Sequence, residues 1–208
     1  MSAPVRFVWL AAALVMLLIA GCSGDVGNQN VHAVYDPATG KLVRLDYDSD
    51  HNGKIDTRAY MDGTRVLRIE IDRNEDGRVD RWEYYGPDEK LQKIGLSRGD
   101  TGRPDEWVYL QDGVTSRIDI STRGNGTIDR WEYYEHGQLA RVEMDGNDDG
   151  RVDQWETYKD GHVSTVAFDT AHRGKPDRRL VYGPDGNLAE VDTDPTGNGQ
   201  WRKVRSDQ

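Results

Sequence analysis

A glycine returns at a nearly constant interval through most of the chain, and this repeat limits the fold more than any other feature. Successive glycines are 24 or 25 residues apart, and six of the seven are followed three positions later by an aspartate. A unit this short is one supersecondary element, which needs similar neighbours to bury its apolar side chains. Residues 32–208 therefore form a tandem array. The glycines are Gly53, Gly77, Gly102, Gly126, Gly150, Gly174 and Gly199.

Each unit has the pattern of two strands joined by a tight turn. The first run is rich in aromatic and β-branched residues, as in RVDRWEYY (78–85), TIDRWEYY (127–134) and RVDQWETY (151–158), which favours a strand. A turn with Asp-Gly or Pro-Asp follows, as at 111–113 and 184–186. The second run alternates apolar and polar residues, as at 66–71, 139–144 and 163–168, which is also typical of strands.

We expect an all-β fold, a tandem antiparallel β-hairpin repeat array of about seven units and up to about 14 strands. In one unit, Asp80, Trp82 and Tyr84 share one face, while Arg81 and Glu83 share the other, because side chains alternate along a strand. Both faces thus mix polar and apolar groups. An open twisted meander or solenoid-like sheet fits this mixture better than a sandwich, and a closed barrel stays an alternative.

The first 22 residues differ from the array. Arg6 is their only charge, and residues 7–20 are almost entirely apolar. This run of about 14 residues predicts a secretory signal, because a bilayer span needs about 20. The stretch Ile19-Ala20-Gly21-Cys22 resembles the lipobox of bacterial lipoproteins. The resemblance implies cleavage before Cys22, a lipid thioether on that cysteine and fatty acylation, for instance by palmitate, of the new N-terminus.

These features divide the chain into a signal peptide (1–21), a lipidated cysteine with its linker (22–31) and the β-hairpin repeat domain (32–208). Ser23 follows the cysteine, and by analogy this implies transfer to the outer membrane. We therefore expect a protein of the cell envelope, anchored to the membrane through lipid on Cys22 and facing either the periplasm or the cell surface. Cys22 is the one cysteine, so no internal disulfide can form.

The chain is acidic, with 37 Asp and Glu against 27 Lys and Arg and a formal net charge of −10. Nucleic acid is therefore not an expected partner, because phosphate binding needs a basic surface. Small cations suit this charge better.

Three of the glycine loops place acids and an amide at alternate positions around the glycine. Calcium takes six to eight oxygens, mostly from carboxylates and carbonyls, and a tight acidic loop supplies them. We therefore predict structural Ca²⁺ sites, although Asp and Asn also favour turns that bind no metal. The candidate ligands are Asp48, Asp50, Asn52 and Asp56; Asp72, Asn74, Asp76 and Asp80; and Asp145, Asn147, Asp149 and Asp153.

These loops resemble the DxDxDGxxD calcium loop shared by EF-hands and by β-flanked repeats of the FG-GAP type. In two of them, Glu83 and Glu156 stand where an EF-hand has its bidentate glutamate. That glutamate lies in a strand-like run here, whereas an EF-hand places it on a helix, so the β-flanked likeness, with the last aspartate as a ligand, fits better.

The other four loops have lost part of this pattern. Arg123 and Arg173 occupy ligand positions in two of them, and we hypothesise that each guanidinium replaces the cation there. The other two begin at Ser97, without the first acids, and at Asp194, where Arg202 replaces the last aspartate.

No arrangement of residues in the sequence points to a catalytic site, and we expect no enzyme. The main prediction is a non-catalytic, lipid-anchored envelope protein with a calcium-stabilised scaffold for binding or structural roles, whose protein or glycan partner the sequence does not name. The alternative is a carbohydrate or cell-wall binding module that uses the repeat-spaced tryptophans. These are Trp82, Trp107, Trp131 and Trp155.

Overall fold

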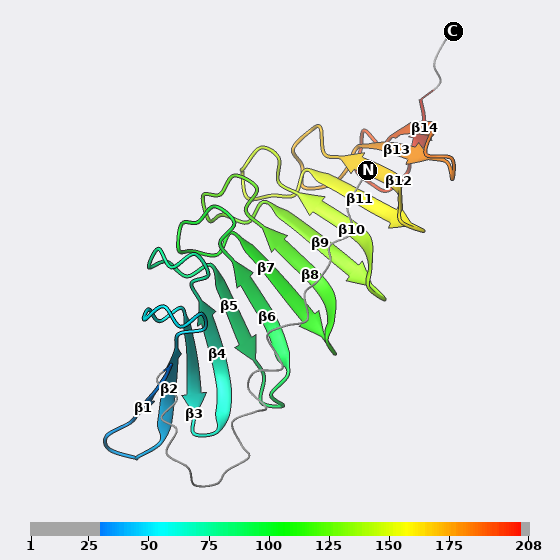
Figure 1. The fold of residues 1–208 in the computed structure, drawn as a ribbon. Helices are drawn as coiled ribbons and strands as arrows, with labels where there is room; N and C mark the ends of the chain where they lie inside the picture. Colours follow the sequence, from blue (N-terminus) through cyan, green and yellow to red (C-terminus); the bar gives the residue numbers. More distant parts are fainter. Residues whose placement is uncertain (1–29, 205–208) are drawn as a thin grey trace.

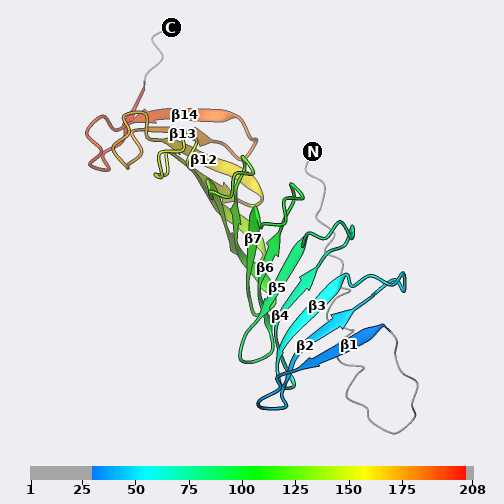
Figure 2. The ribbon, with the colours of Figure 1, turned by 90° about the vertical axis from the view of Figure 1, so that its left-hand side faces the viewer.

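A computed structural model of the protein describes residues 30–204, and these form one open sheet of 15 antiparallel strands in sequence order (Figure 1). The expected all-β hairpin array is confirmed. Strands at the two ends run in clearly different directions (Figure 2), as the cumulative twist of a long sheet requires. The predicted signal peptide and Cys22 lie outside the described residues. The part of the chain that the structure describes holds no helix suited to crossing a membrane.

The glycine loops lie at one end of the strands and the hairpin turns at the other, so that each set forms a row along one long side of the sheet (Figure 1). We use "edge" below for such a row of strand ends. Seven hairpins and a last short strand make up the 15 strands, one more than expected. Strand β5 begins at Arg81, so Val79 and Asp80, which the sequence pattern placed in the strand, belong to the loop. The strands are β1 Val31–Tyr35, β2 Leu42–Tyr47, β3 Thr57–Asp62, β4 Arg65–Ile71, β5 Arg81–Tyr85, β6 Leu91–Leu96, β7 Glu106–Gln111, β8 Val114–Ile120, β9 Arg130–Glu135, β10 Gln138–Met144, β11 Gln154–Lys159, β12 His162–Phe168, β13 Arg178–Tyr182, β14 Leu188–Thr193 and β15 Arg202–Lys203.

Each hairpin has the same irregularity near its turn. Its second strand carries one residue without a partner in the register, and the shift falls at the equivalent place in all seven hairpins. Such a bulge bends the strand and increases its twist. The unpaired residues are Val43, Leu67, Gln92, Ser116, Ala140, Ser164 and Ala189.

The core is a row of side chains along one face, which we call the glutamate face. Ile94, Val108 and Val142 are buried in this row. Glutamates interrupt the apolar residues at three strands. From β2 to β14 the paired residues are Leu45, Ala59, Ile69, Glu83, Ile94, Val108, Ile118, Glu132, Val142, Glu156, Val166, Leu180 and Val191.

The opposite face, here the tryptophan face, carries a ladder of alternating aromatic and cationic side chains. The Arg68 guanidinium lies 4.2 Å from the centre of the Tyr60 ring, and that of Arg141 lies 4.0 Å from the Tyr133 ring. Contacts of this kind hold neighbouring strands together. The ladder is Tyr60, Arg68, Tyr84, Lys93, Tyr109, Arg117, Tyr133 and Arg141.

Candidate metal centres

The seven glycine loops share one backbone frame at the edge of the sheet. We number them loop 1 (48–56), loop 2 (72–80), loop 3 (97–105), loop 4 (121–129), loop 5 (145–153), loop 6 (169–177) and loop 7 (194–202) and count nine positions in each. The N–H at position 1 of a loop donates to the carbonyl at position 9 of the loop before it, as from Asp72 to Asp56 at 2.8 Å. Successive loops are therefore held at a fixed spacing.

Loops 1, 2 and 5 carry all four predicted ligands, and we call them the complete loops. The first aspartate of each accepts hydrogen bonds from backbone N–H groups of its own loop. In loop 1, Asp48 accepts hydrogen bonds from the backbone N–H groups of His51 (2.7 Å), Asn52 (3.1 Å) and Gly53 (2.7 Å). Burial acts to raise the pKa of Asp48, but the three donors outweigh it and hold that pKa below its ordinary value. Asp145 of loop 5 accepts from the equivalent positions. These contacts satisfy oxygens of the buried Asp48 and Asp145 carboxylates.

Loop 1 alone, within residues 30–204, brings three carboxylates close enough to share one cation. Oxygen atoms of Asp48, Asp50 and Asp56 all lie within 4.8 Å of one another, and Asp48 and Asp56 are buried. The fourth predicted ligand, Asn52, donates from its amide nitrogen to Asp50 at 3.1 Å. Oxygen donors at this spacing suit a hard cation.

Loop 2 has a different feature that points to a ligand. Asp72 is only 5% exposed, and its Oδ2 accepts from the Gly77 N–H at 2.9 Å. Its Oδ1 is buried and has no hydrogen-bond partner among the residues described. A buried, unpaired carboxylate oxygen is costly, and a bound cation in the loop would remove that cost. Asn74, Asp76 and Asp80 lie in the same loop.

In loop 5, as in loops 1 and 2, the last aspartate accepts hydrogen bonds from the start of its own loop. Asp153 accepts the N–H groups of Gly146 and Asn147, each at 3.1 Å, and the Asn147 amide nitrogen donates to Asp149 at 3.3 Å. The carboxylates of loop 5 do not meet as those of loop 1 do. Position 3 is Asn147 in loop 5 but an aspartate, Asp50, in loop 1, and this difference accounts for the absence of a third converging carboxylate in loop 5.

Glu83 and Glu156 do not belong to the loops. Glu83 is held on the glutamate face by Arg81 Nε and by the Tyr85 hydroxyl, both at 2.7 Å. Glu156 is held in the same way, between Gln154 (2.7 Å) and Tyr158 (2.6 Å). The EF-hand analogy therefore does not extend to these residues, because their strand directs them to a sheet face.

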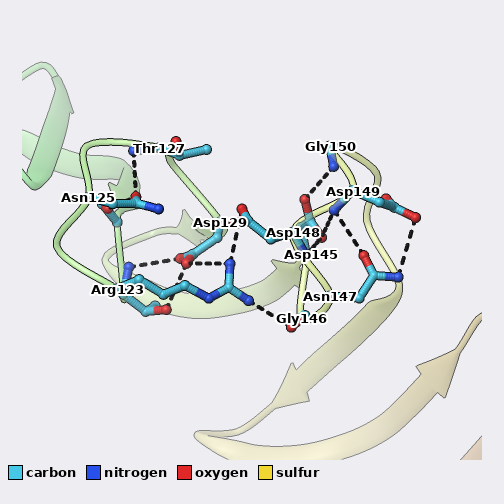
Figure 3. Close-up of polar contacts among 12 residues, drawn as sticks. Arg123, Asn125, Thr127, Asp129, Asp145, Gly146, Asn147, Asp148, Asp149 and Gly150 are labelled. Atoms are coloured by element: carbon cyan, nitrogen blue, oxygen red, sulfur yellow. Dashed lines mark hydrogen bonds and ion pairs between the residues drawn. The ribbon is translucent and has the colours of Figure 1, made fainter.

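Loops 4 and 6 hold a guanidinium beside their last aspartate. Arg123 Nη1 lies 3.5 Å from Asp129 and 3.0 Å from Asp148 of loop 5, and its Nη2 donates to the Gly146 carbonyl at 2.7 Å (Figure 3). Arg173 lies 3.6 Å from Asp177 and donates to the Pro195 carbonyl of loop 7 at 2.7 Å. Each arginine therefore places a positive charge beside its own loop's acid and reaches the next loop.

The sequence patterns missed the role of position 4. Its residue has positive φ in all seven loops, although five of them carry a side chain there. That conformation costs about 1–2 kcal/mol for a residue with Cβ. The residues are His51, Glu75, Asp100, Gly124, Asp148, His172 and Gly197.

The predicted tryptophan column is present on the tryptophan face. Trp82 is buried, and the other three tryptophans are partly exposed. The Lys93 ammonium lies 3.6 Å from the centre of a Trp107 ring. Packing between strands accounts for part of each indole's surface.

No family model and no curated protein sequence matches this chain. Among solved structures, TarM aligns over 48% of this chain and 19% of its own, with 13% identity and a TM-score of 0.37. The GtfA/B complex aligns over 44% and 18%, with 18% identity and a TM-score of 0.35. A complex of accessory secretory proteins 1, 2 and 3 of Streptococcus pneumoniae aligns over 73% and 20%, with 14% identity and a TM-score of 0.27. The chain therefore spans about a fifth of the proteins that it matches, and these similarities do not identify its function.

Proposed function

We propose that this protein is a non-catalytic, lipid-anchored component of the cell envelope whose hairpin array is stabilised by calcium. Cys22 carries the lipid, and the array presents its faces for binding or structural roles. Calcium in loops 1, 2 and 5 offsets the repulsion between acids that share one loop. The protein has no disulfide to stabilise it, because Cys22 is its one cysteine.

The observation that supports the metal most directly is the unpaired, buried Oδ1 of Asp72 in loop 2. The group of Asp48, Asp50 and Asp56 in loop 1 adds a second place where oxygens converge. We favour Ca²⁺ over Mg²⁺ because irregular loops with several carboxylates suit its larger, less regular coordination shell.

Thermal melting with and without calcium tests this proposal. Residues 23–208 are melted in excess chelator and again in about 2 mM Ca²⁺, since extracytoplasmic sites have dissociation constants of about 10⁻⁴–10⁻³ M. Each occupied site then adds about 0.6–1.8 kcal/mol to the free energy of unfolding. Asp72→Asn should reduce the gain, whereas Asp160→Asn, in a hairpin turn, should not. Identical melting curves in chelator and calcium would refute the calcium proposal.

The anchor has its own test. Cells that express the protein should incorporate labelled palmitate into it, and Cys22→Ser should abolish the label and release the protein from the membrane fraction. Labelling that persists in Cys22→Ser would contradict the lipid assignment.

One observation favours the second candidate function, a carbohydrate module. Four arginines of the tryptophan face each pair with an acid two residues further along the strand, as Arg68 does with Glu70 at 3.0 Å; the other three are Arg44, Arg117 and Arg141. Lys93 has Gly95 at that place and makes no ion pair within residues 30–204. Its ammonium beside the Trp107 ring suits an acidic sugar. Tryptophan fluorescence titrated with trigalacturonate, in the wild type and in Lys93→Met, tests this: no change in the wild type would reject it.

A further inference from the structure

Each of the three complete loops contains an asparagine whose amide is held from both sides. Its Oδ1 faces its own loop and accepts a backbone N–H two residues on, at 2.9 Å for Asn52, 3.1 Å for Asn74 and 3.0 Å for Asn147. This leaves a lone pair of the same oxygen for a cation in that loop.

The other side of each amide reaches the next loop. Asn52 Nδ2 donates to Glu75 of loop 2, Asn74 Nδ2 donates to Asp100 of loop 3 at 3.1 Å, and Asn147 Nδ2 contacts His172 Nδ1 of loop 6 at 3.2 Å. Glu75, Asp100 and His172 all occupy position 4 of their loops.

The left-handed backbone at position 4 accompanies these contacts. Where position 4 is Gly124, no side-chain hydrogen bond or ion pair of residues 30–204 joins loop 3 to loop 4. A hollow of ≈ 400 Å³ lies there, lined in part by Thr101, Arg103 and Thr127. In loops 2, 3, 5 and 6, where position 4 carries a side chain and another glycine loop precedes, that side chain contacts the loop before it.

We propose that Glu75, Asp100 and His172 are positioning residues that orient the amide ligand of the preceding loop toward its cation. This inference rests on the proposed calcium binding and adds what that proposal lacks, a contribution from a different hairpin to each site. Groups that orient a metal ligand typically change metal affinity 10–100-fold when they are removed. The unpaired Asp72 Oδ1 marks loop 2, which Asp100 serves, as the clearest case.

The proposal also gives loops 3 and 6 a role. Loop 3 lacks the first acids and loop 6 carries Arg173, yet each supplies the residue that contacts a complete loop before it. Cation binding in one hairpin is then coupled to the docking of the next.

Glycine substitution isolates this effect, because glycine accepts the positive φ of position 4 and occurs there in loops 4 and 7. Calcium is titrated calorimetrically into the whole protein in detergent, as wild type, Asp100→Gly and Glu75→Gly. We expect each variant to lose about tenfold in affinity at one site while its calcium-free melting temperature stays close to that of the wild type.

Two further variants separate positioning from general charge or folding effects. Asp160→Gly removes the same charge from a left-handed turn residue (φ 51°) at the opposite edge of the sheet and should bind calcium as the wild type does. Asp100→Asn keeps an acceptor for the Asn74 amide and should restore most of the affinity, and it provides the test if the glycine variant fails to fold.

The outcomes are distinguishable. A wild-type protein that binds no calcium would overturn the proposed function together with this inference. A wild type that binds calcium, with Asp100→Gly and Glu75→Gly equal to it, would overturn the inference alone. Equal losses in Asp100→Gly and Asp160→Gly would show a general charge effect and would also overturn it.

Discussion

Removing the Tyr85 hydroxyl should destabilise this protein more than the same change at an equivalent tyrosine. Tyr85 donates at 2.7 Å to Glu83, whose side chain is 1% exposed. Burial and this hydrogen bond raise the pKa of Tyr85, so the phenol remains a donor. In Tyr85→Phe, the buried carboxylate keeps only Arg81.

The loss in the free energy of unfolding depends on whether water can replace the tyrosine hydroxyl as a donor to the glutamate. A hydrogen bond to a buried charged group contributes about 1.5–3 kcal/mol. The matched control is Tyr134→Phe, because Tyr134 donates at 2.8 Å to Glu132, whose side chain is 15% exposed and can be hydrated. There we expect about 0.5–1.5 kcal/mol. For a chain of this size, the melting temperature falls about 2–4 °C per kcal/mol, so it should fall about 3–12 °C in Tyr85→Phe and about 1–6 °C in Tyr134→Phe.

Calorimetry of both variants gives the comparison, with hydrogen exchange to confirm that the loss centres on the hairpin of β5 and β6, since repeat arrays can open locally. Equal losses in the two variants would refute the reasoning, because burial of the acceptor would then not set the cost. A larger loss in Tyr134→Phe would refute it as well.

Three other changes have defined outcomes. Arg123→Met should lower the free energy of unfolding by about 1 kcal/mol, because it leaves the buried Asp129 without its cation, while the partly exposed Arg123 allows water to replace part of the lost contact; an unchanged melting temperature would reject the guanidinium hypothesis. Gly95→Ala should cost about 1–3 kcal/mol by overpacking, because its Cβ would lie 2.8 Å from the Trp107 ring, and denaturant unfolding measures this. Burial raises the pKa of Tyr158 to about 12, above the unfolded value of about 10. Its stabilisation is therefore complete below pH ~10 and lost as pH rises toward 12, so that Tyr158→Phe should flatten the alkaline part of the stability curve.

The hairpin array was predictable because its signals are local. Asp112-Gly113 and Asp160-Gly161 have positive φ at both residues, as two-residue hairpin turns require. The regular bulge was not predictable, because the unpaired residues share no chemical type. Some are apolar, as Leu67 is, and others are polar, as Gln92 is.

The candidate sites were predictable only in part. Loop 1 has an aspartate at position 3 and an asparagine at position 5, whereas loops 2 and 5 have the two in the reverse order. Because Asp50 holds position 3, three carboxylates meet in loop 1. The buried, unpaired oxygen of Asp72 in loop 2 has no counterpart in the sequence pattern. The contact between Asn74 and Asp100 joins residues 26 positions apart. It depends on the left-handed backbone of a neighbouring loop, which no residue type marks in the sequence.

Every strand pairs only with the strands before and after it. Within residues 30–204, therefore, no closing contact fixes the number of repeats. Deleting one complete repeat between equivalent positions of two glycine loops would leave an intact loop at the junction. It would shorten the sheet by two strands, about 9.6 Å. Duplicating a repeat would lengthen it by the same step. The length of the array, and with it the reach of the array from the proposed lipid anchor, can thus change in constant increments by unequal exchange of repeats, while every remaining hairpin keeps its neighbours.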